Sequence, residues 1–182
     1  MQIRTDLALE NAEIYWETAK EKSIPGVEYT ESGETVRTTR VDVLDTEGEK
    51  VIGKPRGRYV TIEMPSLLGN DPSVFKEAAK CLAKEISEMA NHPRLTLVAG
   101  LGNGEITPDS LGPKVVPKLV VTRHLFSHMP KATERLAPVC ALAPGVLGIT
   151  GIETGEIIKG VAERVEPDLV IVVDALASRK TE

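Results

Sequence analysis

The stretch from Arg94 to Pro113 restricts the fold of this chain more than any other, because an apolar run gives way within it to a loop rich in glycine. The run from Leu95 to Ala99 is continuous rather than alternating, which predicts a strand buried on both faces. The glycines that follow permit backbone conformations closed to other residues and leave their N–H groups accessible. Thr107 and Pro108 have the residue types of a helix N-cap and a first helical position, with Asp109 in the first turn. A strand, a glycine loop and a helix start form the place where open α/β sheets bind ligands.

Further strands and helices alternate along the chain. Apolar runs predict strands over residues 137–143 and 169–173, the second of them buried, and helical periodicity covers residues 7–22, 72–89 and 154–165. Residues 36–64 combine β-branched residues with turns near 46–49 and 53–57, which predicts a small antiparallel excursion. Continuous apolar strands favour an α/β fold with a mostly parallel, twisted sheet and helices on both faces.

The helix expected from residue 72 shows the clearest pattern in the sequence. Asp71 is expected to cap it and Pro72 to occupy its first position. Its apolar residues recur at helical spacing and predict one core-facing stripe. The stripe consists of Val74, Ala78, Cys81, Leu82, Ile86 and Met89.

Length and composition limit the classes of protein to consider. A chain of 182 residues suits a single domain over residues 1–182, with a sizeable core. The formal net charge of −5 argues against direct nucleic-acid binding, and no apolar run reaches the ~18 residues of a membrane span. Cys81 and Cys140 are expected to be free, buried thiols in a reducing cytoplasm.

Two carboxylates flank the expected crevice. Because parallel strands end along one edge of a sheet, Asp109 and Asp174 are predicted to face one another across neighbouring strand ends. Such a pair can act as general base and general acid around a water. The N–H groups of the loop formed by Gly100, Gly102, Asn103 and Gly104 are candidate oxyanion donors. From the pattern alone, a helix-capping role for both aspartates is the favoured alternative.

Two other ligand classes fit the pattern less well. The glycine loop differs from the dinucleotide fingerprint, because its third glycine is Gly104 rather than residue 105 and the helix start is delayed. His124 and His128 have the spacing of zinc ligands on a helix. Residues 126–130 have the composition of a loop, however, and no third ligand is evident, so we expect paired surface histidines and no metal site.

Seven motifs, in order along nearly the whole chain, resemble the germination protease family of spore-forming bacteria. They are Arg4-Thr-Asp-Leu-Ala8, Gly100-Leu-Gly-Asn103, Thr107-Pro-Asp-Ser-Leu-Gly-Pro113, Thr122-Arg-His-Leu125, Ala143-Pro-Gly-Val-Leu-Gly148, Thr150-Gly-Ile-Glu-Thr154 and Asp174-Ala-Leu-Ala-Ser-Arg179. The resemblance implies an endopeptidase of atypical aspartic type, whose two aspartates match Asp109 and Asp174. It therefore favours catalysis over capping for this pair.

The same resemblance implies the biological setting. Germination proteases degrade small acid-soluble spore proteins during germination, act as homotetramers in the spore core, and are made as zymogens. The chain begins almost at the first motif, so it resembles the processed form. It resembles the N-terminal part of the family pattern, so we expect the C-terminal part to be missing and the activity of this chain alone to be affected.

A wider similarity supplies the main alternative. Gly100-Leu-Gly-Asn103 and Val172-Val-Asp-Ala175 are similar to motifs of hydrogenase maturation peptidases, whose matching acids help bind a metal. No cofactor is expected for a two-aspartate peptidase, whereas this alternative requires a metal and a further ligand. A non-catalytic, sporulation-related binding protein with the same fold is the other alternative.

Overall fold

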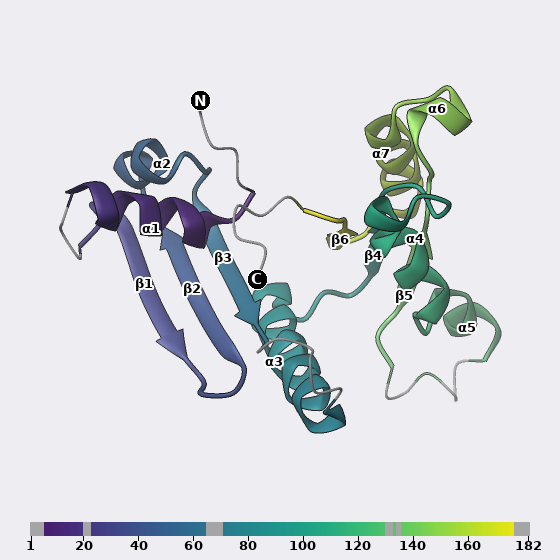
Figure 1. Cartoon of the computed structure of the whole chain (residues 1–182). Coiled ribbons are helices and arrows are strands. Elements are labelled where there is room, and N and C mark those ends of the chain that lie inside the picture. Colours follow the sequence, from purple (N-terminus) through teal and green to yellow (C-terminus); the bar gives the residue numbers. More distant parts are fainter. Residues whose placement is uncertain (1–5, 20–22, 65–70, 130–132, 134–135, 177–182) are drawn as a thin grey trace. The chain divides into compact units, whose positions relative to one another are not determined.

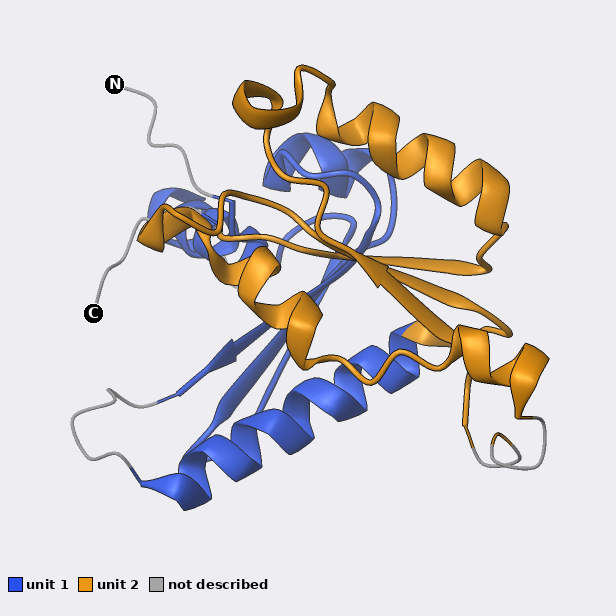
Figure 2. Cartoon of the chain, turned by 90° about the vertical axis from the view of Figure 1, so that its right-hand side faces the viewer, with its two compact units in different colours: residues 1–89, 176–182 blue, residues 90–175 orange. Residues whose placement is uncertain are grey.

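The structure, a computed structural model, describes residues 6–19, 23–64, 71–129, 133 and 136–176. Its contacts divide the chain into two compact units, residues 1–89 with 176–182 and residues 90–175 (Figure 2). The first unit holds an antiparallel sheet and the second a parallel sheet (Figure 1). The α/β class predicted from the sequence is therefore confirmed. The single domain expected for residues 1–182 stays a prediction.

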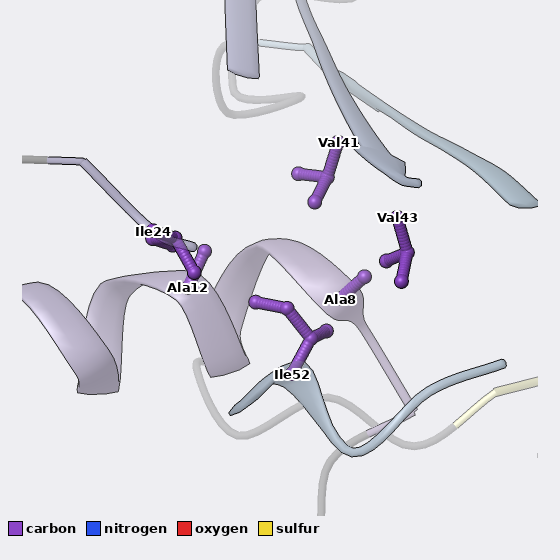
Figure 3. Packing of buried hydrophobic residues seen from close by; sticks show 6 residues of the cluster. All are labelled: Ala8, Ala12, Ile24, Val41, Val43 and Ile52. Carbon is purple, nitrogen blue, oxygen red and sulfur yellow. The ribbon is translucent and has the colours of Figure 1, made fainter. Parts of the chain in front are cut away.

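The first unit is built on a three-stranded sheet in the order β1 (Val27–Ser32), β2 (Arg37–Val43), β3 (Gly57–Glu63). On the central strand, Val41 and Val43 are buried and lie in one apolar cluster with residues of helix α1 (Ala8–Ala19). Figure 3 shows this cluster, which comprises Ala8, Ala12, Ile24, Val41, Val43 and Ile52. Trp16 packs against it and meets the ring of Tyr29 edge-on, with 4.8 Å between ring centroids. The core of this unit thus lies between α1 and one face of the sheet.

The antiparallel part is larger than the excursion predicted for residues 36–64. Strand β1 precedes that range, and the turn expected near residue 46 is helix α2 (Thr46–Ile52). The side chain of Asp45 caps α2 by accepting hydrogen bonds from the N–H groups of Glu47 at 2.9 Å and Gly48 at 3.0 Å. Gly53 ends the helix in a left-handed conformation. A segment with the composition of a turn is therefore a short, capped helix, and its Ile52 is buried in the core.

Helix α3 (Pro72–Ala90) starts where the sequence predicts, and the Asp71 carboxylate accepts a hydrogen bond from the Ser73 N–H at 2.8 Å. The predicted core stripe is wrong in part. Val74, Ala78 and Cys81 are half-buried, but the remaining members of the stripe are exposed: Leu82 by 52%, Ile86 by 40% and Met89 by 52%. The apolar arc of α3 is wider than the surface that covers it. Cys81 and Cys140 are both free, and both are half-buried rather than buried.

An ion pair joins α3 to the sheet of the first unit. Arg40 of β2 donates to both carboxylate oxygens of Glu85, from Nε at 2.9 Å and from Nη2, and Nη2 also reaches Glu88 at 3.1 Å. The side chain of Glu85 is only 6% exposed, whereas that of Glu88 is 40% exposed. Hydrogen bonds from the Arg40 guanidinium hold the pKa of Glu85 below its ordinary value. The buried carboxylate is thereby kept charged and paired.

The second unit contains the parallel sheet, in the order β5 (Val139–Leu142), β4 (Thr96–Gly100), β6 (Leu169–Val173). The connection from β4 to β5 carries the short helices α4 (Leu111–Val115), η3 (Val116–Lys118) and α5 (Arg123–His128). The return to β6 carries α6 (Leu147–Thr150) and α7 (Thr154–Val165). Right-handed crossovers that run in opposite directions place their helices on opposite faces. Figure 2 shows α7 on one side of the strands and α4 with η3 on the other.

The strands of this sheet differ in burial. All five residues of β4 are buried, as the sequence predicts. The prediction of a buried strand over residues 169–173 is wrong, because β6 alternates between half-buried and exposed residues, with Val170 exposed by 40% and Val172 by 51%. β4 has a partner on each side, whereas β6 is at an edge of the sheet.

Smaller departures concern the segments after the central strand. Ile106, not Thr107, is the N-cap of the turn that holds Pro108, and that turn is a 3₁₀ helix, η2 (Thr107–Asp109). His124 and His128 both lie in α5, so the loop expected from residue 126 begins only after His128. Among the described residues, no helix has both the length and the apolar character needed to cross a bilayer.

Replacing Glu85 with Gln is expected to lower the free energy of unfolding by about 3 kcal/mol at neutral pH, because Arg40 loses its buried counter-charge. Glu88→Gln, at the exposed end of the same pair, is expected to cost less than about 1 kcal/mol. Since the folded-state pKa of Glu85 is depressed, its charge stabilises the fold above the unfolded pKa. That stabilisation is lost as the pH falls through the folded pKa. Urea unfolding of both variants across acidic pH measures this, and equal losses for Glu85→Gln and Glu88→Gln would contradict it.

Candidate active site

Both predicted catalytic aspartates belong to the second unit and follow the carboxyl ends of neighbouring strands. β4 pairs directly with β6, with Gly100 opposite Val173. One residue further, the Leu101 N–H donates to the Val173 carbonyl at 2.8 Å. Asp174 comes next after that carbonyl. The pairing therefore brings the start of the glycine loop and Asp174 to the same edge of the sheet, since adjacent strands lie about 4.8 Å apart.

A loop returns Asp109 to the end of β4. The Asn103 N–H donates both to Oδ2 of Asp109 at 2.8 Å and to the backbone carbonyl of Asp109 at 3.0 Å. Gly102 lies beneath these contacts with φ at +107°, a conformation that side chains rarely allow. A Cβ atom at this position would lie 2.8 Å from Oδ1 of Asp109 and closer still to its backbone oxygen. Gly102 is therefore required for the close approach of Asp109 to the loop.

Asn103 also closes the loop on itself. Its side-chain Oδ1 accepts from the Glu105 N–H at 3.0 Å, and its carbonyl accepts from the Ile106 N–H at 3.1 Å. The Asp109 N–H in turn donates to the Ile106 carbonyl at 2.9 Å. Three successive turns thus fix the path from β4 to Asp109. Gly102 and Asn103, predicted as substrate-binding residues, are the residues that hold this aspartate.

A further glycine lets α4 approach the strand ends. A Cβ atom on Gly112 would fall within contact distance of the Leu101 backbone and of the Val173 carbonyl oxygen. Sequence analysis did not single out Gly112 as a site residue. The feature that pointed to it was a glycine inside a helical segment, where propensity disfavours it and close packing is the usual reason for it.

Asp174 is held less tightly than Asp109. It is exposed, and its Oδ1 accepts a hydrogen bond from the N–H of the next residue, Ala175, at 2.8 Å. Asp109 is half-buried. The two carboxylates therefore share one sheet edge in different environments, one fixed by the glycine loop and the other open to solvent.

The loop N–H groups differ in their availability to a substrate. The Asn103 N–H is committed to Asp109, and Gly100 ends the buried strand β4. Among the residues that the structure describes, no acceptor pairs with the N–H groups of Gly102 or Gly104. Gly102 is buried and Gly104 exposed. Gly104 is thus the most exposed of the four predicted residues.

The capping alternative does not account for the contacts of Asp109. Its carboxylate accepts from Asn103, six residues earlier, and not from an N–H in the first turn of a helix. Neither η2 nor α4 has a side-chain hydrogen bond at its N-cap. For metals, no group of three or more His, Cys, Asp or Glu side chains with a suitable arrangement is found within the described part of the chain.

Comparison with known proteins agrees with the motifs. A family model described as germination protease matches residues 5–182. The chain belongs to the germination protease family. It is 54% identical over 184 residues to the germination protease of Caldanaerobacter subterraneus subsp. tengcongensis, covering 99% of this chain and 56% of that relative.

Other germination proteases show the same pattern of coverage. The Clostridium perfringens protein is 51% identical, over 99% of this chain and 57% of its own length. The Bacillus licheniformis protein is 43% identical, over 99% of this chain and 51% of its own length. The chain thus spans about half the length of the curated relatives it matches.

Substituting Gly102 with Ala is expected to displace Asp109 and to destabilise the loop by about 2 kcal/mol, because it adds both a clash and backbone strain. Gly104→Ala is the matched control in the same loop, since its Cβ would meet only Pro113, at 3.6 Å. It is expected to change stability by less than about 0.5 kcal/mol. Thermal unfolding and the NMR shifts of the Asn103 amide compare the two. Unchanged Asn103 shifts in Gly102→Ala would rule out the close contact.

Proposed function

We propose that this chain is the peptidase part of a germination protease, an endopeptidase that cleaves small acid-soluble spore proteins with a water activated by Asp109 and Asp174. The observation that carries the proposal is the placement of both carboxylates after neighbouring parallel strands, at the edge where open α/β sheets bind their ligands. Family membership supplies the substrate class, since the relatives are named germination proteases.

The chemistry requires one ionised and one protonated carboxyl in the pair. The ionised aspartate takes a proton from water as the water oxygen attacks the carbonyl carbon of the scissile peptide. The other aspartate donates its proton to the leaving amide nitrogen, and the C–N bond breaks. The products are a new carboxyl group and a new amine, and the aspartates exchange protonation states during the cycle.

The loop supports this reaction in two ways. The Asn103 N–H orients Asp109 by donating to Oδ2, and Oδ1 has no hydrogen-bond partner among the described residues. The Gly104 N–H, exposed and without a partner in the described residues, is the group best placed to donate to the carbonyl oxygen as negative charge develops there. We assign substrate binding to Gly104, whereas Gly102 is buried and serves to admit Asp109.

The proposal extends to the setting of the enzyme. By family membership we assign it to the spore core, as a homotetramer processed from a zymogen, and without a cofactor. A net charge of −5 argues against a nucleic acid as the direct partner and says little about a protein substrate. The metal-dependent alternative and the non-catalytic alternative are separated from this proposal by the experiment below.

Cleavage of a purified small acid-soluble spore protein, followed by mass spectrometry, tests the proposal. Asp109→Asn and Asp174→Asn are each expected to lower the cleavage rate by at least about 100-fold, because each removes a group that transfers a proton. Glu163→Gln is the control, since Glu163 is an exposed carboxylate on α7 that pairs loosely with Lys159, at 3.9 Å, and takes no part in the β4–β6 pairing. It is expected to retain activity, and chelator is expected to have no effect.

Three outcomes would separate the alternatives from the two-aspartate proposal. Loss of activity with chelator and recovery with metal would support the maturation-type alternative. Equal loss in Glu163→Gln would show that the loss is not specific to the two aspartates. Absence of cleavage by the unsubstituted chain, under conditions where the Caldanaerobacter relative cleaves the same substrate, would support the binding protein or a requirement for more of the family polypeptide.

A further inference from the structure

The outer edge of β6 offers an open ladder of backbone groups. The Val173 carbonyl accepts from Leu101, and the Leu169 N–H donates to the Leu95 carbonyl, so residues 169, 171 and 173 face β4. Because backbone groups alternate sides along a strand, those of Val170 and Val172 face away from β4. β6 has no other partner strand among the residues the structure describes.

The side chains of the same two residues are exposed. Val170 is exposed by 40% and Val172 by 51%, whereas every residue of β4 is buried. Strands of parallel sheets are normally covered on both faces, and apolar runs such as Leu169–Val173 are typical of interior strands. The composition of β6 is therefore that of an interior strand in an edge position.

An apolar groove lies along α7, the helix that leads into β6. It has a volume of about 520 Å³, and its lining is almost entirely apolar. Gly160 lies in this groove, and a Cβ atom there would meet nothing within 4 Å. A glycine on an exposed helix face permits close approach of a second helix. The lining residues are Ile152, Ile157, Gly160, Val161 and Val165, together with the charged Glu156 and Arg164.

We propose that the outer edge of β6 and the groove of α7 bind a further β-strand and helix, supplied by the part of germination proteases that lies outside the sequence matched here. The open ladder of β6 fits the strand of such a unit, and the groove of α7 fits its helix. Open α/β sheets grow by strand–helix units of this kind. The relatives are long enough to supply it, since 99% of this chain covers only 56% of the Caldanaerobacter protein.

Two other occupants fit less well. A substrate segment could extend the sheet at β6, but it would leave the α7 groove empty. A second copy of this chain could pair its own open β6 edge with this one, but it would present the same α7 groove rather than a strand with a helix that fills it, and the exchange experiment below separates the two cases. A strand followed or preceded by a helix uses both features at once. If that strand is parallel to β6, its carboxyl end lies beside Asp174.

Amide exchange tests the proposal without requiring catalytic activity, so its failure is distinct from failure of the proposed function. The chain is labelled with ¹⁵N and mixed with a separately expressed polypeptide, the part of the Caldanaerobacter protease that this chain does not match. Exchange of the Val170 and Val172 amides is expected to slow by about tenfold or more. The amides of Leu169 and Ile171, which already face β4, are the internal control.

Two variants locate the effect. Val172→Pro removes an N–H that faces away from β4, so it is expected to leave the sheet intact and to weaken binding about tenfold or more. Gly160→Leu fills the groove of α7 with a better helix former and is expected to block binding while preserving the helix. Gly155→Leu, on the same helix and outside the groove, is its matched control and is expected to bind normally.

The proposal is overturned if the added polypeptide leaves the exchange of Val170 and Val172 unchanged. It is also overturned if an unlabelled copy of this chain, or a small acid-soluble spore protein, slows their exchange as well as the added polypeptide does. Equal binding by Gly160→Leu and Gly155→Leu would exclude the groove of α7.

Discussion

The parallel pairing of β4 with β6 is the constraint on which the candidate site depends. The two strands are joined along residues 96–100 and 169–173, more than seventy positions apart in the chain. The pairing is fastened at both ends, by Leu101 and Val173 at the carboxyl end and by Asp168 at the other. At the amino end of the two strands, the Asp168 carboxylate accepts hydrogen bonds from Arg94 and from the Leu95 N–H. The Arg94 guanidinium holds the pKa of Asp168 below its ordinary value. A slip of one residue would turn the Asp174 side chain to the other face of the sheet.

The two aspartates reach the same edge of the sheet by different means, and their carboxylates lie in different environments. Asp174 needs only the end of a strand, so its carboxylate is exposed and makes one local hydrogen bond. Asp109 is positioned by the whole segment from Gly102 to η2. It is half-buried, and its carboxylate accepts a hydrogen bond from the backbone N–H of Asn103. The glycine loop thus has a positioning role before it has any role toward a substrate. Of the N–H groups in this loop, that of Asn103 donates to Asp109. The N–H groups without a partner among the described residues remain for a peptide carbonyl.

Local patterns predicted the elements that local physics determines. The continuous apolar run of β4, the Asp71 cap of α3 and the periodicity of α7 each specify their element within a few residues. The predictions failed where burial depends on residues distant in the sequence, or where one residue decides between a turn and a helix. β6 was expected to be buried because its composition is that of an interior strand, but burial depends on which strands lie beside it. Leu82 and Ile86 were assigned to a core that covers only part of α3. Helix α2 was missed because a single cap at Asp45 outweighs the turn composition of its first residues.

For the site itself, the sequence could place the aspartates on one sheet edge but could not decide between capping and catalysis. The contacts of Asp109 bear on that choice. A capping carboxylate would accept from N–H groups at the start of η2 or α4, where its charge favours the positive end of the helix. The Asp109 carboxylate instead accepts from Asn103, on the loop that leaves β4, and the Cβ-free surface of Gly102 is what lets it come so close. A chain that needed only a cap could use Ser or Asn at many positions and would need no glycine beneath it. The arrangement costs backbone freedom and makes no hydrogen bond to a helix N-cap, so its physical effect is to hold the Asp109 carboxylate against the loop that leaves β4.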